Sequence, residues 1–156
     1  MIDLKSILVP TDFSDTSIVA VRYGAALARA FNAKLCLLHV VHETFSDDLI
    51  AAATLGMLDM AKQGARDRLA RILTLQEERA LKPEYVVRSG APGIEIVEYA
   101  KEHSVDLIVA ATRGRGAVAH MLEGSVAERL LRKAPCPVLI VRHPEHEFVQ
   151  PEAAAS

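Results

Sequence analysis

The alternation of five short apolar runs with longer helical segments is the feature that most limits how this chain can fold. Each run is rich in Val, Ile and Leu and is bounded by polar residues, Gly or Pro, as buried strands are. Strands that alternate with helices in this way form a parallel sheet with helices on both faces. The sequence therefore predicts an α/β fold with a single-domain, open, parallel five-stranded sheet, its strands at 6–10, 34–41, 84–90, 106–111 and 137–141.

Cap residues and apolar spacing predict where the intervening helices lie. Ser14 can cap a helix that continues to about Phe31, and Pro92 stands at the first position of another helix. The Ala- and Leu-rich segment 47–76 reads as one long helix, and a fourth helix is expected at 125–133. These helices supply the right-handed crossovers that a parallel sheet requires.

Composition and charge narrow the class of protein. A chain of 156 residues suits one domain, which we place at 1–143, with 144–156 as a flexible C-terminal tail that lacks an apolar period. A net charge of −2 offers no electrostatic footprint for nucleic acid, and no apolar run is long enough to cross a bilayer. We therefore expect a soluble, cytoplasmic protein in which Cys36 and Cys136 are reduced thiols.

The passage from the fourth strand to the fourth helix carries the residues best suited to an anion. In sheets of this class, ligands lie beyond the carboxyl ends of the strands, where the winding reverses direction. Glycines let backbone N–H groups approach a phosphate, and arginines add charge-assisted hydrogen bonds. A helix N-terminus attracts negative charge as well. The residues in question are Arg113-Gly114-Arg115-Gly116 and Gly124-Ser125.

A purely structural explanation of the same residues stays open. Ser125 and Glu128 fit a capping box, which satisfies backbone amides without any ligand. A P-loop is excluded because the chain has no Gly-Lys-Ser/Thr, and residues 114–119 match a dinucleotide fingerprint only weakly. His39 and His42 have no partners at metal-ligand spacing, so we expect no metal site there.

The spacing within 111–125 matches a known signature. Gly114 is followed by the nine residues RGAVAHMLE and then by Gly124-Ser125, with ILVPTDFS near the start of the chain and APCPVLIVR near its end. By these motifs, over residues 3 to about 143, the chain resembles the UspA-like universal stress proteins, in particular the branch that binds adenine nucleotides. The first glycine of the signature is Ala111 here. The resemblance implies the strand order 3-2-1-4-5 of adenine nucleotide alpha hydrolase-like folds.

The resemblance also implies where the adenosine half of a nucleotide would bind. Pro10, Thr11 and Asp12 follow the first strand and would lie against adenine and ribose, with Asp12 accepting hydrogen bonds. Val40 and Val41 end the second strand and would meet the adenine edge through backbone groups. Without the resemblance, Asp12 would read as a turn or cap residue.

The phosphates would lie between the glycine loop and the start of the fourth helix. The implied ligand is ATP, ADP or AMP, and the charge of ATP is compatible with bound Mg²⁺, although no carboxylate cluster is dedicated to the ion. The residues implied on this side are Ala111, Arg113, Gly114, Arg115, Gly116, Gly124, Ser125 and Val126.

Three functions remain open on the sequence. The first, which the resemblance favours, is a nucleotide-binding regulator of the stress response that forms a homodimer through its last strand, Val138–Val141. The second is a slow ATPase, although no evident base stands beside the phosphate loop, so we expect no efficient enzyme. The third is a stress-protein dimer that binds no nucleotide, which Ala111 favours.

Overall fold

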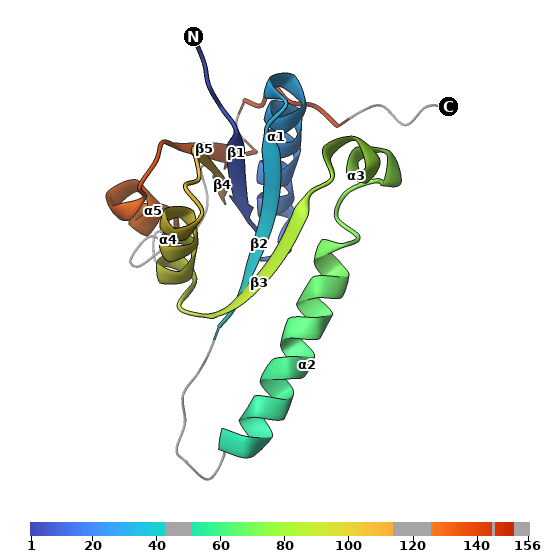
Figure 1. Ribbon diagram of the computed structural model, residues 1–156, viewed down its shortest axis with the longest axis vertical. Coiled ribbons are helices and arrows are strands. Elements are labelled where there is room, and N and C mark those ends of the chain that lie inside the picture. The colour runs from blue at the N-terminus through green and yellow to red at the C-terminus, as the bar shows by residue number, and fades with distance from the viewer. Residues whose placement is uncertain (43–50, 114–125, 145, 152–156) are drawn as a thin grey trace.

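The centre of the protein is a parallel sheet with the strand order β3-β2-β1-β4-β5 (Figure 1). The computed structural model of the chain describes residues 1–42, 51–113, 126–144 and 146–151. It confirms the α/β class, the five parallel strands and the strand order that the sequence predicts. The strands are β1 (Ser6–Pro10), β2 (Lys34–His42), β3 (Glu84–Gly90), β4 (Leu107–Arg113) and β5 (Val138–His143).

Successive residues of the central strand face opposite sides of the sheet. Ile7 and Val9 belong to one hydrophobic cluster, and Leu8 between them belongs to the other. All three side chains are completely buried. Because both faces are covered, the apolar runs are continuous instead of alternating with polar residues.

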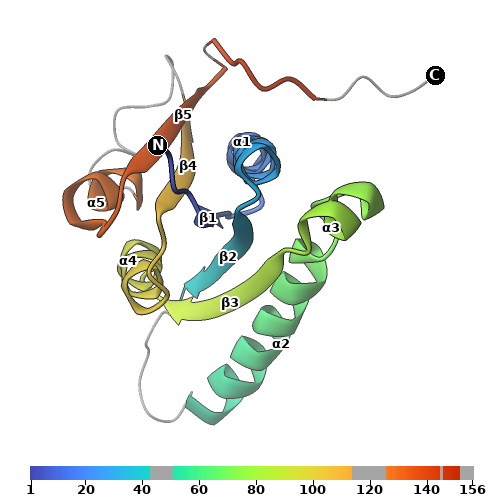
Figure 2. The ribbon, with the colours of Figure 1, turned by 45° about the horizontal axis from the view of Figure 1, so that its top comes forward.

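Helices cover the two faces unequally (Figure 2). Ser14 caps α1 by accepting a hydrogen bond from the backbone N–H of Ser17, and Pro92 is the first residue of α4, both as the sequence predicts. Among the described residues, no helix combines the length and the apolar character needed to span a membrane. One face carries α1 (Asp15–Phe31), α2 (Ala51–Leu69) and α3 (Leu75–Leu81), and the other carries α4 (Pro92–Glu102) and α5 (Val126–Lys133).

The expected long helix over 47–76 is wrong in its C-terminal part. Helix α2 ends at Leu69, and a separate helix, α3, begins after Thr74. The break follows from a capping box, in which the Thr74 side chain accepts from the Glu77 N–H and the Glu77 carboxylate accepts from the Thr74 N–H. Such reciprocal bonds satisfy the N–H groups at the start of a helix. The expected start of the long helix, at residue 47, lies outside the described residues.

Part of the segment that we expected to be a flexible tail packs against α1. The hydroxyl of Tyr23 accepts a hydrogen bond from the Phe148 N–H at 2.8 Å, and the two rings meet edge to face with centroids 4.8 Å apart. Glu147 accepts from Arg22 and pairs with His143 at 2.5 Å. These contacts involve single side chains, so a search for an apolar period does not reveal them.

We predict that Gly24→Ala destabilises the protein. A Cβ at this position of α1 would lie 2.3 Å from Cγ2 of the buried Val9, so helix and strand would have to separate. Overpacking of this kind costs about 1–3 kcal/mol, which exceeds the gain in helix propensity of about 1 kcal/mol. Urea unfolding should report the loss, and Gly24→Ala should cost less in a Val9→Ala background than in the wild type.

The glycines of α2 provide the control for this prediction. A Cβ at Gly56 or Gly64 meets no atom within 4 Å. Gly64→Ala should therefore stabilise the protein, by up to about 1 kcal/mol, through helix propensity alone. Equal effects of Gly24→Ala and Gly64→Ala would contradict the close approach of α1 to β1.

Candidate functional site

The turn between β1 and α1 is held by a network around Thr11. Thr11 is buried, and its hydroxyl lies 2.8 Å from that of Ser17 and accepts from the Phe13 N–H at 3.0 Å. Its own N–H donates to the carbonyl of Leu38 in β2 at 2.9 Å. These bonds connect the turn to α1 and to the neighbouring strand. They therefore hold the backbone of Asp12, which lies between Thr11 and Phe13.

Asp12 presents a carboxylate at the carboxyl edge of the sheet. Its side chain is exposed, and one carboxylate oxygen accepts from the Ser14 N–H at 2.9 Å. Partial loss of hydration would raise the pKa of Asp12, but hydrogen bonds from Ser14 and Ser17 outweigh it and hold the pKa below its ordinary value. Asp12 is therefore ionised at neutral pH, with acceptor capacity left for a ligand.

Phe13 takes a left-handed backbone conformation directly after Asp12. Its φ is 66°, which is uncommon for an aromatic residue. The Phe13 ring centroid lies 4.5 Å from that of His39, and the guanidinium carbon of Arg68 lies 4.1 Å from the Phe13 centroid. His39 Nδ1 is 2.8 Å from the Thr11 carbonyl, which can only accept, so this nitrogen carries the proton.

The end of β2 lies beside this turn. The parallel ladder aligns Pro10 with Leu38, so the residues that follow in the two strands continue next to each other. Val40 is buried and Val41 is half-buried, and both pair with β3 on their other side. The structure thus brings together the two groups of residues that we expected to contact adenosine.

β4 continues beyond the short ladder that pairs it with β1. The ladder between them aligns Ile7 with Leu107 and Leu8 with Ile108, whereas β4 itself continues to Arg113. β1 lies between β2 and β4. From β1 the chain adds β2 and β3 on one side and then β4 and β5 on the other, so the winding reverses beside β1. In open sheets, ligands bind at the carboxyl ends of the strands at this point. Ala111 lies in this extension of β4, and its methyl group packs against the cluster beneath α1.

The phosphate side of the expected site is described only at its borders. For Arg113 the structure describes the backbone, at the end of β4, and Val126 is the first residue of α5. The two described ends therefore frame the connection that carries the signature. The expected residues that lie outside the described part of the chain are Gly114, Arg115, Gly116, Gly124 and Ser125.

Several residues of the turn were not identified from the sequence. Ser17 could have been found, because a hydroxyl one helical turn after Ser14 and near Thr11 in sequence is a local signal. Phe13 in the turn contacts His39 of β2, and Arg68 of α2 lies over the Phe13 ring. These contacts join segments that are distant in the chain, so no local pattern indicates them.

The cysteines provide no reactive group near this site. Both Cys36 and Cys136 are free. Burial raises the pKa of the Cys36 thiol to about 11, and burial also raises the pKa of Cys136, so both thiols are protonated at neutral pH. Within the described ranges, no three His, Cys, Asp or Glu side chains gather where they could hold a metal ion.

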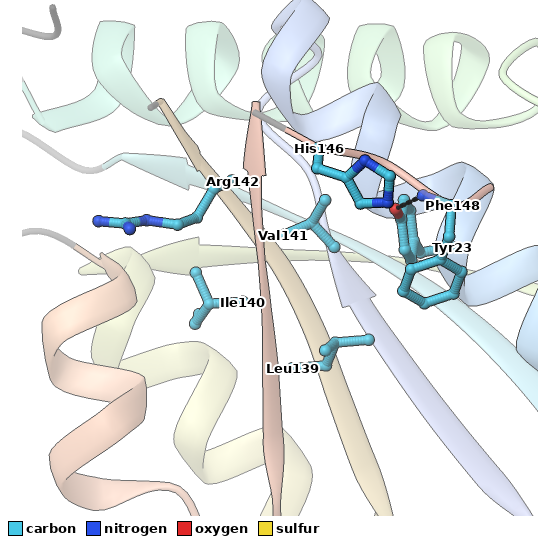
Figure 3. Close-up of a pocket in the computed structure, with 7 residues that line it drawn as sticks. All are labelled: Tyr23, Leu139, Ile140, Val141, Arg142, His146 and Phe148. Carbon is cyan, nitrogen blue, oxygen red and sulfur yellow. Dashed lines mark hydrogen bonds between the residues drawn. The ribbon is translucent and has the colours of Figure 1, made fainter. Parts of the chain in front are cut away.

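A second concave surface follows the edge strand β5 (Figure 3). It is a groove of about 390 Å³, and it includes part of the last strand, which we expected to join two copies. Figure 3 shows the side chain of Arg142 directed away from the ring of Tyr23, which lies at the other end of the groove beside Phe148. The groove is lined by Tyr23, Leu139, Ile140, Val141, Arg142, His146 and Phe148.

Comparison with known proteins decides the family. Residues 3–142 match the universal stress protein family. The chain belongs to this family. Universal stress protein MJ0531 of Methanocaldococcus jannaschii is 34% identical over 144 residues, which cover 92% of this chain and 85% of the relative.

Two solved structures of universal stress proteins are similar to this one in three dimensions. The universal stress protein UspA from Lactobacillus plantarum has a TM-score of 0.74 at 27% identity and covers 91% of this chain and 100% of its own. A universal stress protein in complex with cAMP has a TM-score of 0.59 at 28% identity and covers 88% of this chain and 95% of its own. At least one relative in the family therefore binds an adenine nucleotide.

We predict that the free energy of unfolding of this universal stress protein falls at acid pH, partly because Asp12 becomes protonated. Its pKa in the folded protein lies below the ordinary value of 3.8, so the carboxylate stabilises the fold above that value, and this contribution is lost as the pH falls through the folded pKa. Asp12→Asn should therefore show a smaller loss of unfolding free energy between about pH 5 and about pH 3 than the wild type. Urea unfolding at each pH measures it.

Asp15→Asn is the matched control for this prediction. Asp15 stands in the first turn of α1, so the variant removes a negative charge from the same helix end. If Asp12→Asn and Asp15→Asn change the pH dependence equally, the hydrogen bonds to Asp12 have no specific effect.

Proposed function

We propose that the protein is a cytoplasmic regulator of the stress response that binds an adenine nucleotide at the carboxyl ends of β1, β2 and β4. The observation that carries this proposal is the ionised Asp12 carboxylate, held beside the end of β2 at the point where the sheet reverses its winding. A family relative that has been solved with cAMP supports the same ligand class.

The adenosine half of the ligand binds between the turn and β2. Asp12 accepts hydrogen bonds from the ribose hydroxyls, since a carboxylate has about four acceptor positions and the exposed Asp12 side chain can use those that the serines leave open. Backbone groups of Val40 and Val41 meet the adenine edge, and the buried side chain of Val40 keeps that strand end in place. Ala111 is compatible with this ligand because its methyl group packs toward the α1 side of the sheet.

The phosphates extend toward the signature between β4 and α5. Its glycines allow close approach of N–H groups, its arginines add positive charge, and the start of α5 adds the helix dipole. Mg²⁺ accompanies the phosphates of ATP in this proposal. The residues assigned are Gly114, Arg115, Gly116, Gly124 and Ser125, with Arg113 and Val126 at the borders.

The protein acts through occupancy of the site and not through rapid turnover. A carboxylate whose pKa is lowered is a weak base at neutral pH, so Asp12 is poorly suited to activate water. A ligand that binds only the folded state stabilises it in proportion to its concentration, which lets the nucleotide level become a signal. Slow hydrolysis of ATP is compatible with this role.

We predict that ATP with Mg²⁺ raises the melting temperature of the wild type in a concentration-dependent way. A ligand at about a hundred times its Kd stabilises a protein by about 2.7 kcal/mol. Asp12→Asn should weaken ATP binding at least tenfold, because a charge-assisted hydrogen bond contributes about 1.5–3 kcal/mol. Isothermal titration calorimetry measures the Kd for ATP of the wild type and of Asp12→Asn. Asp15→Asn controls for the loss of a negative charge.

Two results would contradict this proposal. Absence of any shift at millimolar ATP, ADP and AMP would assign the protein to the stress proteins that bind no nucleotide. Rapid release of ADP that disappears in Asp12→Asn would make it an enzyme instead.

We further propose that two copies associate through the edge strand β5. An edge strand exposes unpaired N–H and C=O groups, and this one carries apolar side chains next to the groove of Figure 3. A two-fold axis at this edge would join two copies through the same surface on each. The residues assigned to the contact are Val138–Val141.

We predict that Ile140→Lys converts the dimer into monomers. Ile140 is half-buried in the single chain and lines the groove, so a lysine there would place a charge in the contact. Leu131→Lys is the control, since Leu131 is 65% exposed on α5. Sedimentation velocity should give a dimer for the wild type and Leu131→Lys but a monomer for Ile140→Lys. A monomeric wild type, or a dimeric Ile140→Lys, would contradict the assignment.

A further inference from the structure

The backbone of Phe13 is strained at the residue that follows Asp12. A φ of 66° is costly for an aromatic residue and persists only when the surrounding structure enforces it. Strained residues of this kind gather at ligand sites, where the strain holds a neighbouring group in position. The structure must therefore contain contacts that keep Phe13, and with it Asp12, in this conformation.

The Phe13 side chain is held from two different elements. The ring of His39 in β2 lies 4.5 Å away at an angle of 33°, and the His39 imidazole is itself fixed by its hydrogen bond to the Thr11 carbonyl. The guanidinium of Arg68 lies over the Phe13 ring at 4.1 Å, within the range of a cation–π interaction. Arg68 belongs to α2, so this contact joins that helix to the turn.

Helix α2 packs against β2 and β3 through only part of its described length. Ala65 and Leu69 are buried in the C-terminal half, whereas Met57 and Met60 are 71% and 76% exposed. Both ribbon views show the N-terminal half of α2 extending away from the sheet (Figures 1 and 2). The contact of Arg68 with Phe13 thus lies at the end of α2 that is packed.

We propose that Arg68 is a positioning residue of the nucleotide site. Its guanidinium keeps the Phe13 ring against His39, which maintains the strained turn and aims the Asp12 carboxylate at the ligand. The inference rests on the proposed function in naming an adenine nucleotide as the ligand. It adds that α2 and the site are coupled, so that nucleotide binding restrains the C-terminal end of α2 and a disturbance of α2 weakens nucleotide binding by the same factor.

Equilibrium binding to the 156-residue chain tests the role of Arg68. Arg68→Ala should raise the Kd for both adenosine and ATP by about two- to fivefold, the factor that corresponds to an exposed cation–π contact. The same factor is expected for both ligands because Asp12 serves the ribose and not the phosphates. Arg68→Lys should restore most of the affinity, since an ammonium group retains the charge over the ring.

Two further variants separate positioning from general effects. Arg66→Ala removes an exposed cation from the same helix and should leave both Kd values unchanged. Phe13→Leu removes the aromatic face, so Arg68→Ala should have no additional effect in that background. A decrease in melting temperature for Arg68→Ala with unchanged Kd values would overturn the inference, as would equal effects of Arg68→Ala and Arg66→Ala.

Hydrogen exchange in the protein without nucleotide gives an independent readout. The N–H groups of Phe13 and Ser14 donate to Thr11 and Asp12, so their exchange rates report how firmly the turn is held. Both should exchange faster in Arg68→Ala than in the wild type or in Arg66→Ala. If the wild type binds no nucleotide, the proposed function fails, while the exchange rates still decide whether Arg68 holds the turn. Unchanged exchange in Arg68→Ala would overturn the positioning role.

Discussion

The complete burial of β1 is the constraint on which the rest of the structure depends. This strand lies between β2 and β4 and packs under helices on both faces, with Leu8 and Val9 entirely removed from water. The close approach of Gly24 to Val9 sets the distance between α1 and the sheet. Because α1 follows β1 directly, that distance also fixes the turn that carries Asp12.

Strain at the turn is tolerable only because rigid elements surround it. Thr11 ties the turn to β2 and to α1, and Phe13 is held by side chains from β2 and α2. A turn on an isolated hairpin would relax to an unstrained conformation, since a left-handed backbone conformation is unfavourable for an aromatic residue without such support. Contacts with the sheet and its helices thus keep the backbone of Asp12 ordered, although its side chain is exposed.

Local chemistry explains which parts of the structure could be predicted from sequence. The strands were predictable because buried parallel strands read as continuous apolar runs, and the starts of α1 and α4 because Ser14 and Pro92 act within one turn. The break before α3 had a local signal, Thr74 with Glu77, but helix-forming residues on both sides outweighed it. The aromatic and cationic contacts around the turn join distant segments, and nothing in a single sequence indicates which long side chains will meet.

The two edges of the sheet differ in a way that bears on how copies of the chain associate. On β3, Glu84 pairs with Lys34, and Arg88 pairs with Glu95 and Glu102, so that edge carries charge. Charged side chains discourage further strand pairing because adding a strand would remove them from water. The four residues Val138–Val141 of β5 carry no charge, and three of them line a groove together with Tyr23 and Phe148. The asymmetry supports association through β5 alone, which joins two sheets around one two-fold axis and leaves only the charged β3 edges exposed.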